Sequence, residues 1–468
     1  MTLRLLTLLL VACGPIGPDT GRPVRPSSDN PTNLLITLLE QDHFVQEGAF
    51  VFSDYAGCCE PDARCLGNNP TTPYGTYALP NSPGQTRVVD DFFSAWGELP
   101  KPELNRTFML RADEAIVFVG TLPPRARYLG LRSYLATRVE PDNKYAILGS
   151  LGPSLNQYQI AEERGVAVDE IWGQPIVVVT TADAAVEAIV HEQLHRAGFD
   201  MNTVHNDRIP LELVRMGVSE TDDTFEVTAR VGVPDDPAAE AAWRADPGAT
   251  LLRVSPRVMT APVSPHPWPE LPPRGTGSTE DGYTDAVEAL RVAIKGHHAT
   301  HDAVTLVASP VHIETLTCIA NRDCAGDIHD RFAAIRTNIH LFTDDEFIVV
   351  FGVNHERSGK ASYSNFAVVR EENLVGIDAV HSGQMPGSAQ FYLPDHPQAD
   401  DLYAWTVARD CSTHAEACME LGTTCPSPDY DQEIRVTVRA YLEPQTGSAP
   451  LSTEMIGDRI MKLEPLEN

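Results

Sequence analysis

The sequence DEAIVFVG at Asp113–Gly120 recurs as DEFIVVFG at Asp345–Gly352. Each copy places an acidic pair before a run of apolar, mostly β-branched or aromatic residues, which is typical of a buried β-strand. The alignment continues without gaps as far as Arg138 and Arg370, and it contains seven identities over 26 positions. A duplicated domain explains the match, and two unrelated strands after similar acidic turns explain it as well.

Further strand patterns surround both copies. They cover 115–122, 132–138, 144–151, 176–181, 225–231 and 250–258 in the N-terminal half, and 303–309, 347–354, 363–369, 402–409 and 433–441 in the C-terminal half. Helices are predicted from an Asp183 cap to Ala197, after an Asp236 cap, and over 285–295, where Gly296 ends the pattern. The last strand alternates apolar and polar residues, which indicates a sheet with one solvent-exposed face. We therefore predict a mixed α+β fold with two sheet-containing halves and substantial antiparallel structure.

A proline-rich segment separates the two halves. Seven of the eighteen residues at 256–273 are proline, and 274–282 adds glycine, serine and threonine. Such composition is typical of a linker. We therefore expect a first α/β domain at 33–255, a linker at 256–282 and a second, β-rich domain at 283–468. Residues 13–32, rich in proline, glycine, serine and aspartate, are predicted to form a flexible tether.

The N-terminus has the pattern of an export signal. Arg4 precedes the apolar stretch Leu5–Ala12, which is far shorter than the ~20 residues that a membrane-spanning helix needs. Leu10-Val11-Ala12-Cys13 resembles the lipobox of bacterial lipoprotein signal peptides. The resemblance implies that 1–12 are removed and that Cys13 is the site of lipid attachment. Gly14 stands where an aspartate would resemble an inner-membrane retention signal, which favours the outer membrane, on its periplasmic or surface face.

An ordinary secretory signal that ends near a cysteine is the alternative. Either interpretation places the mature chain in the cell envelope or beyond it, in an oxidising compartment.

The other eight cysteines are an even number, which predicts four disulfides in an exported chain. Cys318 and Cys324 form the obvious local pair. The two outer clusters hold three cysteines each, so we expect one bridge to join the 58–65 region to the 411–425 region. A zinc site is the alternative, but no CxxC pair supports it. The disulfide candidates are Cys58, Cys59, Cys65, Cys318, Cys324, Cys411, Cys418 and Cys425.

The formal charge of −30, from 35 basic and 65 acidic residues, limits the partners of this chain. Nucleic-acid binding is not expected, because phosphates are neutralised by lysine and arginine patches. The charge also argues against peripheral binding to anionic lipid, so we expect membrane contact through the lipid anchor only. The charge is compatible with cation binding, but a solvated acidic surface is the commoner explanation.

One motif carries recognisable chemistry. His191-Glu192-Gln193-Leu194-His195 matches H-E-x-x-H, in which two imidazoles on one helix face bind zinc and the glutamate acts as general base. Gly198 follows as in the metzincin metallopeptidases, but Met201 occupies the position of the third ligand, and His205 is the nearest substitute.

The helical wheel favours a structural role for this helix instead. It places Val186, Ile189, Val190, Gln193 and Ala197 in a buried stripe, with His191 and His195 on the opposite, solvent-exposed face.

Two further kinds of cluster are weaker candidates for metal binding. His297, His298 and His301 could bind a metal, although a solvated loop after Gly296 is the simpler interpretation. Three acidic pairs could bind calcium, but turn and edge charges explain them as well. These pairs are Asp90–Asp91, Asp222–Asp223 and Asp344–Asp345.

Three stretches resemble an uncharacterised family of exported bacterial proteins. They are AILGSLGPSLN at Ala146–Asn156, FGVNH at Phe351–His355 with GKASYSNF at Gly359–Phe366, and RAYLEP at Arg439–Pro444. The resemblance covers most of the mature chain and implies that the helix with His191 is an ordinary scaffold helix.

Three functions remain open at this point. The first is a lipid-anchored envelope protein that binds a ligand or partner. The second is a zinc-dependent hydrolase with His191 and His195 as ligands and Glu192 as base, and the third is a structural envelope component.

Overall fold

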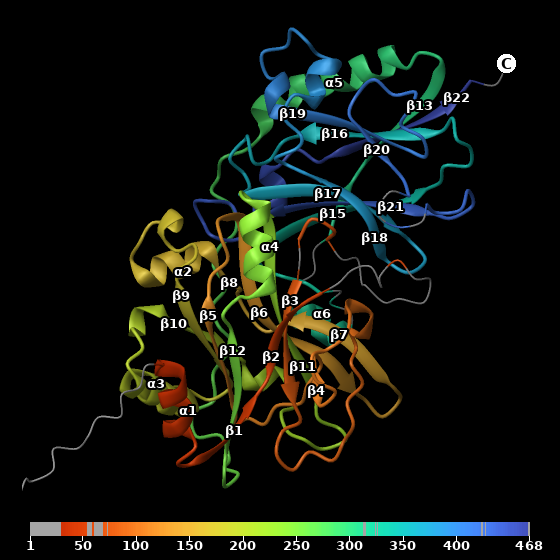
Figure 1. Cartoon of the computed structure of the whole chain (residues 1–468). Coiled ribbons are helices and arrows are strands. Elements are labelled where there is room, and N and C mark those ends of the chain that lie inside the picture. The colour runs from red at the N-terminus through yellow and green to blue at the C-terminus, as the bar shows by residue number, and fades with distance from the viewer. Residues whose placement is uncertain are drawn as a thin grey trace, which may run out of the picture.

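The computed structural model describes residues 30–53, 59, 69–72, 74–311, 315–322, 324, 326–422, 425 and 427–466. Two halves lie one above the other, and each half contains two packed β-sheets and covering helices (Figure 1). The expected α+β class with two sheet-containing halves is confirmed. Among the described residues, no helix is long and apolar enough to cross a membrane.

The first half consists of two sheets. In spatial order, sheet 1 comprises β1 (His43–Glu47), β12 (Thr250–Pro256), β5 (Ala115–Thr121), β9 (Pro175–Thr181) and β10 (Val204–Arg208). Sheet 2 comprises β2 (Ala49–Phe52), β3 (Tyr74–Pro80), β11 (Thr224–Pro234), β6 (Ala126–Val139) and β7 (Lys144–Ser150), with β4 (Leu104–Asn105) beside β3 and β8 (Leu155–Asn156) beside β6.

Strand β5 shows why the first repeat copy is so apolar. Ile116 and Phe118 point into the core between sheets 1 and 2, while Ala115 and Val117 pack against helices on the other face. Those helices are α1 (Pro31–Leu39) and α3 (Ala184–Ala197), and α2 (Gln157–Arg164) and α4 (Pro237–Ala245) lie nearer the second half (Figure 1). A strand that is buried on both faces needs apolar residues at every position.

The second half has the same construction. Sheet 3 comprises β14 (Ser309–Pro310), β15 (Arg331–Ile339), β21 (Ile434–Tyr441), β17 (Tyr363–Arg370) and β18 (Val375–His381). Sheet 4 comprises β13 (His301–Val307), β22 (Arg459–Pro465), β16 (Phe347–Val353), β19 (Leu402–Ala408) and β20 (Cys418–Glu420). Helix α5 (Thr284–His297) covers the outer face of sheet 4, and the short α6 (Thr315–Asn321) lies beside β7.

The two halves share one topology. When the two-residue strands β4 and β8 are left out and the strands of each half are taken in chain order, the spatial orders in sheets 1 and 2 are repeated in sheets 4 and 3, including the parallel pairs β9–β10 and β19–β20. The repeated stretches form equivalent strands, β5 and β16. Strand β5 lies between β12 and β9, and β16 lies between the corresponding strands β22 and β19. The topology therefore supports duplication over two unrelated strands.

Beyond β5 and β16 the gapless alignment loses register. Val233 and Leu442 both have left-handed backbones (φ of 50° and 49°) at the ends of β11 and β21, which makes Arg230 the counterpart of Arg439. Gly232 of β11 then corresponds to Tyr441 of β21. Because Gly232 pairs with Tyr128 and Tyr441 pairs with Tyr363, these two tyrosines occupy equivalent positions. The identity of Arg138 and Arg370 is therefore coincidental, because the connections before β6 and β17 differ in length.

Sheets 2 and 3 bury polar faces against each other, and we call this contact the seam. On β11, Phe225 and Val227 point into the core of the first half, and Arg230 points into the seam, where it stacks on the rings of Tyr74 and Tyr134. Sheet 3 crosses this face of sheet 2 (Figure 1). The predicted solvent-exposed face of 433–441 is thus wrong, since Thr437 and Arg439 are 6% and 3% exposed. The second sheet pair covers them.

The hydrogen bonds across the seam are reciprocal. Tyr128 of the first half donates its hydroxyl to Asp330 of the second half at 3.0 Å, and Tyr363 of the second half bonds to Thr71 of the first. Asp330 lies three residues before Ala333, which pairs with Arg439, and Thr71 lies three residues before the position that pairs with Arg230. Each tyrosine therefore contacts the counterpart of the other tyrosine's partner, as in an isologous dimer interface.

Disulfides follow the expected pattern where the structure describes them. Cys318 pairs with Cys324, Cys411 pairs with Cys418, and the predicted bridge between the two outer clusters joins Cys59 to Cys425. Cys13, Cys58 and Cys65 lie outside the described residues.

Several elements depart from the sequence-based expectations. Helix α1 begins inside the expected tether, because Asn30 caps it and Pro31 occupies its first turn. Strand β3 lies in a stretch of sequence that is otherwise rich in glycine and proline. Helix α5 continues through Gly296 to His297, so His297 and His298 stand at a helix end, and His301 is the first residue of β13 (His301–Val307), not part of a solvated loop.

Removing the hydroxyl of Tyr128 or Tyr363 should destabilise the chain. Each Tyr→Phe change leaves a buried acceptor or hydroxyl without its partner across the seam, and we expect a loss of about 1–2 kcal/mol in the free energy of unfolding. Urea unfolding with intact disulfides measures this loss. Tyr430→Phe, at a tyrosine that is 47% exposed, is the matched control and should change stability little. Equal stabilities for all three variants would show that the seam bonds contribute nothing.

Candidate functional site

Helix α3, which carries the H-E-x-x-H motif, forms as expected. Asp183 accepts a hydrogen bond from the Ala185 amide at its start, and Gly198 ends it with a left-handed backbone (φ of 91°). The buried stripe differs in part from the prediction. Leu194 is fully buried where Gln193 was expected, and Ile189 is 42% exposed because the helix packs on sheet 1 along a slightly rotated face.

The structure does not bring a third zinc ligand to this helix. His191 Nε2 lies 2.8 Å from Asn206 Oδ1 of β10, while Glu192 and His195 are exposed. His205 is 1% exposed and pairs with Glu163, so it does not approach the motif. Within the described ranges, three metal donors lie within 4.8 Å of one another only at the Cys318–Cys324 disulfide beside Asp327, where the cysteines are oxidised.

The acidic pairs mostly serve as ion-pair and turn partners. Asp91 accepts a hydrogen bond from Arg106 at 2.8 Å, and Asp223 binds the Arg138 guanidinium at 2.7 Å. Asp222 accepts from the backbone of Ser219 in a turn. Asp344 and Asp345 line one cavity together, and Asp91 lines another without Asp90.

A cleft of about 550 Å³ lies between the halves, at one end of the seam. The first half, the linker and the second half all contribute to its wall, and Asp330 lies at its buried end. The lining residues are Pro153, Ser154, Asn156, Tyr158, Gln159, Glu162, Glu270, Leu271, Pro272, Pro273, Asp330, Pro444, Gln445, Thr446 and Gly447.

Asp330 of the second half is held by two side chains of the first half. Its carboxylate accepts hydrogen bonds from the Tyr128 hydroxyl at 3.0 Å and from Asn156 Nδ2 at 3.1 Å. In the chain, Asp330 is the residue immediately before β15. Burial raises the pKa of Asp330 to about 7, against the lowering effect of these hydrogen bonds. A carboxyl group with this pKa exchanges its proton near neutrality, which is a common property of functional sites.

Asn156 connects the cleft to helix α2. Its Oδ1 accepts from the amides of Tyr158 and Gln159 as the N-cap, and its Nδ2 donates to Asp330 and to the Gly447 carbonyl. One side chain therefore fixes the helix start, the carboxyl group and the 444–447 loop.

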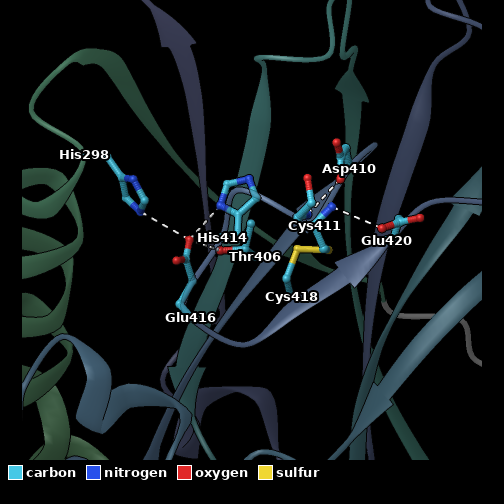
Figure 2. Close-up of a disulfide and its surroundings, with 9 residues drawn as sticks. His298, Thr406, Asp410, Cys411, His414, Glu416, Cys418 and Glu420 are labelled. Carbon is cyan, nitrogen blue, oxygen red and sulfur yellow. Dashed lines mark hydrogen bonds and ion pairs between the residues drawn. A yellow bond between two sulfur atoms is a disulfide. The ribbon is translucent and has the colours of Figure 1, made fainter.

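A second cleft, of about 800 Å³, lies in the second half at the end of α5. It combines residues that the sequence analysis singled out separately, His297, His298 and His301 with Asp344–Asp345, and adds His414 and Glu416 from the β19–β20 connection. Figure 2 shows His298 and His414 on either side of Glu416, next to the Cys411–Cys418 disulfide. Burial lowers the pKa of His298 to about 4, although Glu416 opposes this shift.

Asp330, His414 and Glu416 escaped the sequence analysis. Asp330 precedes a strand whose pattern was not recognised, and its importance depends on a partner 202 residues away. A signal did exist for the other two, because CSTHAEAC at Cys411–Cys418 places a histidine and a glutamate two residues apart inside a short disulfide loop.

Comparisons with known proteins assign no activity. No protein-family model and no curated protein matches the chain. Among solved structures, the chain is similar to an uncharacterised protein from Burkholderia cenocepacia, with a TM-score of 0.39 and 11% identity over 96% of this chain and 92% of that one. It is also similar to a protein from Vibrio parahaemolyticus, with a TM-score of 0.35 and 10% identity over 77% and 88% of the two chains. Both similarities are too distant to support an argument about function.

Glu226, which lies beside Arg230 on the seam face of β11, should make stability depend on pH. Burial raises the pKa of Glu226 to about 8 from 4.5, so the native state binds more protons than the unfolded state between these pH values. Stability should therefore fall as pH rises from about 4.5 to about 8 and level off above that, with on the order of 5 kcal/mol from this group.

The variant Glu226→Gln stays neutral at every pH, so its free energy of unfolding should rise relative to that of the wild type as pH rises from 4.5 to 8. Urea unfolding at both pH values measures the difference, and the exposed Glu98→Gln is the control. A constant difference between Glu226→Gln and wild type would contradict the assignment.

Proposed function

We propose that this chain is an extracytoplasmic binding protein that holds a small, amine-bearing ligand in the cleft between its halves. The observation that carries the proposal is the buried carboxyl group of Asp330 at the inner end of that cleft. The disulfides Cys59–Cys425, Cys318–Cys324 and Cys411–Cys418 fit a chain that works outside the cytoplasm.

The duplication separates structural need from function at this position. The counterpart of Asp330 is Thr71, which bonds to Tyr363 as Asp330 bonds to Tyr128. A hydroxyl group therefore suffices for the seam, yet the second half carries a carboxyl group whose burial is costly. Residues that break a local rule without structural benefit are expected at functional sites.

The charge of the lining determines the ligand class. The cleft contains the carboxyl groups of Asp330, Glu162 and Glu270, and none of the described residues that line it is basic. Anionic ligands such as phosphates and carboxylates are disfavoured here by like-charge repulsion, as they are by the net charge of −30. A protonated amine complements both the carboxyl group at the inner end and the acidic rim.

The shape of the lining suits a small ligand. Pro153, Pro272, Pro273 and Pro444 form rigid apolar parts of the wall, and Tyr158 adds an aromatic ring. The volume of about 550 Å³ is within the usual range for small-molecule sites. Aromatic faces also attract ammonium groups.

The test is titration calorimetry with matched amine and neutral probes. We expect spermidine or glucosamine to bind, and glucose and 1,4-butanediol not to bind. Because the pKa of Asp330 is about 7 and an ammonium ion binds its ionised form, amine affinity should rise with pH up to about 7 and level off above it.

Two variants test the role of the carboxyl group. Asp330→Asn keeps its shape, and Asp330→Thr reproduces the counterpart residue Thr71, so both should fold while losing amine affinity at least tenfold together with its pH dependence. Amine binding that both variants retain would place the site elsewhere. Absence of binding to any probe by the wild type would leave a structural envelope role as the better interpretation.

We also propose that the chain is anchored in the outer membrane by lipid at Cys13, because its signal pattern resembles that of lipoproteins. In a bacterial host, Cys13→Ser should move the protein from the membrane fraction to the soluble periplasmic fraction and abolish labelling by a palmitate analogue. Unchanged fractionation and labelling would show that the N-terminus is an ordinary secretory signal.

A further inference from the structure

One end of the first half, which points away from the second half (Figure 1), carries the most exposed apolar side chains among the described residues. Val88, Val258, Met259 and Val263 are 84%, 76%, 70% and 78% exposed, and every other large apolar side chain is at most 56% exposed. We propose that this end contacts the lipid bilayer in which Cys13 is anchored, with Val258, Met259 and Val263 inserted among the lipid headgroups. The contact rests on the proposed anchor at Cys13 and adds a second attachment to it.

The backbone that carries these three side chains, the loop 257–265 after β12, is held in place. The Thr260 amide donates to the Asp113 carboxylate at 2.8 Å. The amides of Val263 and Ser264 donate at 2.5 and 3.0 Å to Asp183, the residue that also caps α3. Both aspartates are buried. The loop therefore holds its apolar side chains out into solvent on a fixed backbone.

These exposed positions form a group. Single exposed apolar residues are ordinary, but three within the six residues 258–263 make a patch of the kind that marks an interaction surface. The Arg111 guanidinium donates to the carbonyls of Pro83 at 3.3 Å and Pro256 at 3.5 Å. The connection that carries Val88 thus meets the loop 257–265 at the same end of the half.

The start of the chain identifies the occupant of this surface. Arg257 donates to the Glu40 carbonyl at 2.8 Å, just after the last residue of α1. A helix of nine residues is about 13 Å long, so the loop lies close to the point where the folded chain begins at Asn30. Sixteen residues separate Asn30 from Cys13, and a chain of that length spans at most about 60 Å. A lipid on Cys13 therefore keeps the loop at a high effective concentration near the bilayer.

The charges select an uncharged lipid surface. The net charge of −30 repels anionic headgroups, whereas valine and methionine gain from leaving water whatever the headgroup charge. Binding through them should therefore be insensitive to salt. A loop with a fixed backbone also loses little conformational entropy on insertion, which favours even a small contact.

The first test is fluorescence quenching on phosphatidylcholine vesicles that contain spin-labelled phosphatidylcholine. In Met259→Trp, the added emission should shift to shorter wavelength and fall by at least half. Val292→Trp, at a 56% exposed position of α5 in the second half, is the matched control and should change little.

Two forms of the protein separate this contact from the anchor. One is the acylated chain, and the other is residues 14–468 held on a nickel-chelating lipid by an N-terminal hexahistidine. If Cys13 is not acylated, the second form still reports whether the loop meets the bilayer.

The second test is co-sedimentation of untethered residues 14–468 with the same vesicles. Val258→Ser/Met259→Ser/Val263→Ser should partition at least tenfold less than the wild type, because it loses the apolar contact. Val292→Ser/Val304→Ser/Val307→Ser replaces three exposed valines of the second half and should partition like the wild type.

Four results would each overturn the proposal. They are equal quenching of Met259→Trp and Val292→Trp in the hexahistidine-tethered form, equal partitioning of the two triple variants, binding that requires anionic lipid or is lost in high salt, and capture of a protein by the loop without quenching by lipid.

Discussion

The burial of two polar sheet faces against each other is the constraint on which this structure depends. Buried polar groups are costly unless they are paired, so sheets 2 and 3 can meet only where their side chains find partners. Tyr128 with Asp330 and Tyr363 with Thr71 meet this condition reciprocally. These directional bonds favour one arrangement of the halves, whereas apolar faces would tolerate small shifts. The Cys59–Cys425 bridge links the same two halves covalently.

Duplication explains both the symmetry of the seam and the place where the symmetry breaks. Two copies of one topology pack as a symmetric dimer does, and neither copy can change its seam residues without affecting the other. At Thr71 and Asp330 the copies nevertheless differ in charge. The cleft between the halves opens at the carboxyl group, where the linker and the 444–447 loop complete its wall. A structural contact in one half thus became a chemically distinct group in the other.

The second cleft, at the end of α5, illustrates a different principle. His414 and Glu416 stand on the connection between β19 and β20, at one end of sheet 4, and the sheet and α5 hold this end of the structure in place. Loops positioned by a rigid scaffold often carry function. The short disulfide between Cys411 and Cys418 restrains a loop that would otherwise lose more conformational entropy on ordering His414 and Glu416.

The sequence by itself determined the strands with strong patterns, the caps of α3 and α4, the α+β class, and the bridge between the outer cysteine clusters. These features depend on local periodicity, on cap chemistry and on the parity of cysteines. Only the tertiary structure decided which polar faces are buried, because the alternation of β21 is the same whether water or a second sheet covers Arg439. It also decided the sites, since Asp330 meets Tyr128 and His298 meets Glu416 across more than a hundred residues of chain. Pairing at that distance leaves no trace in local pattern.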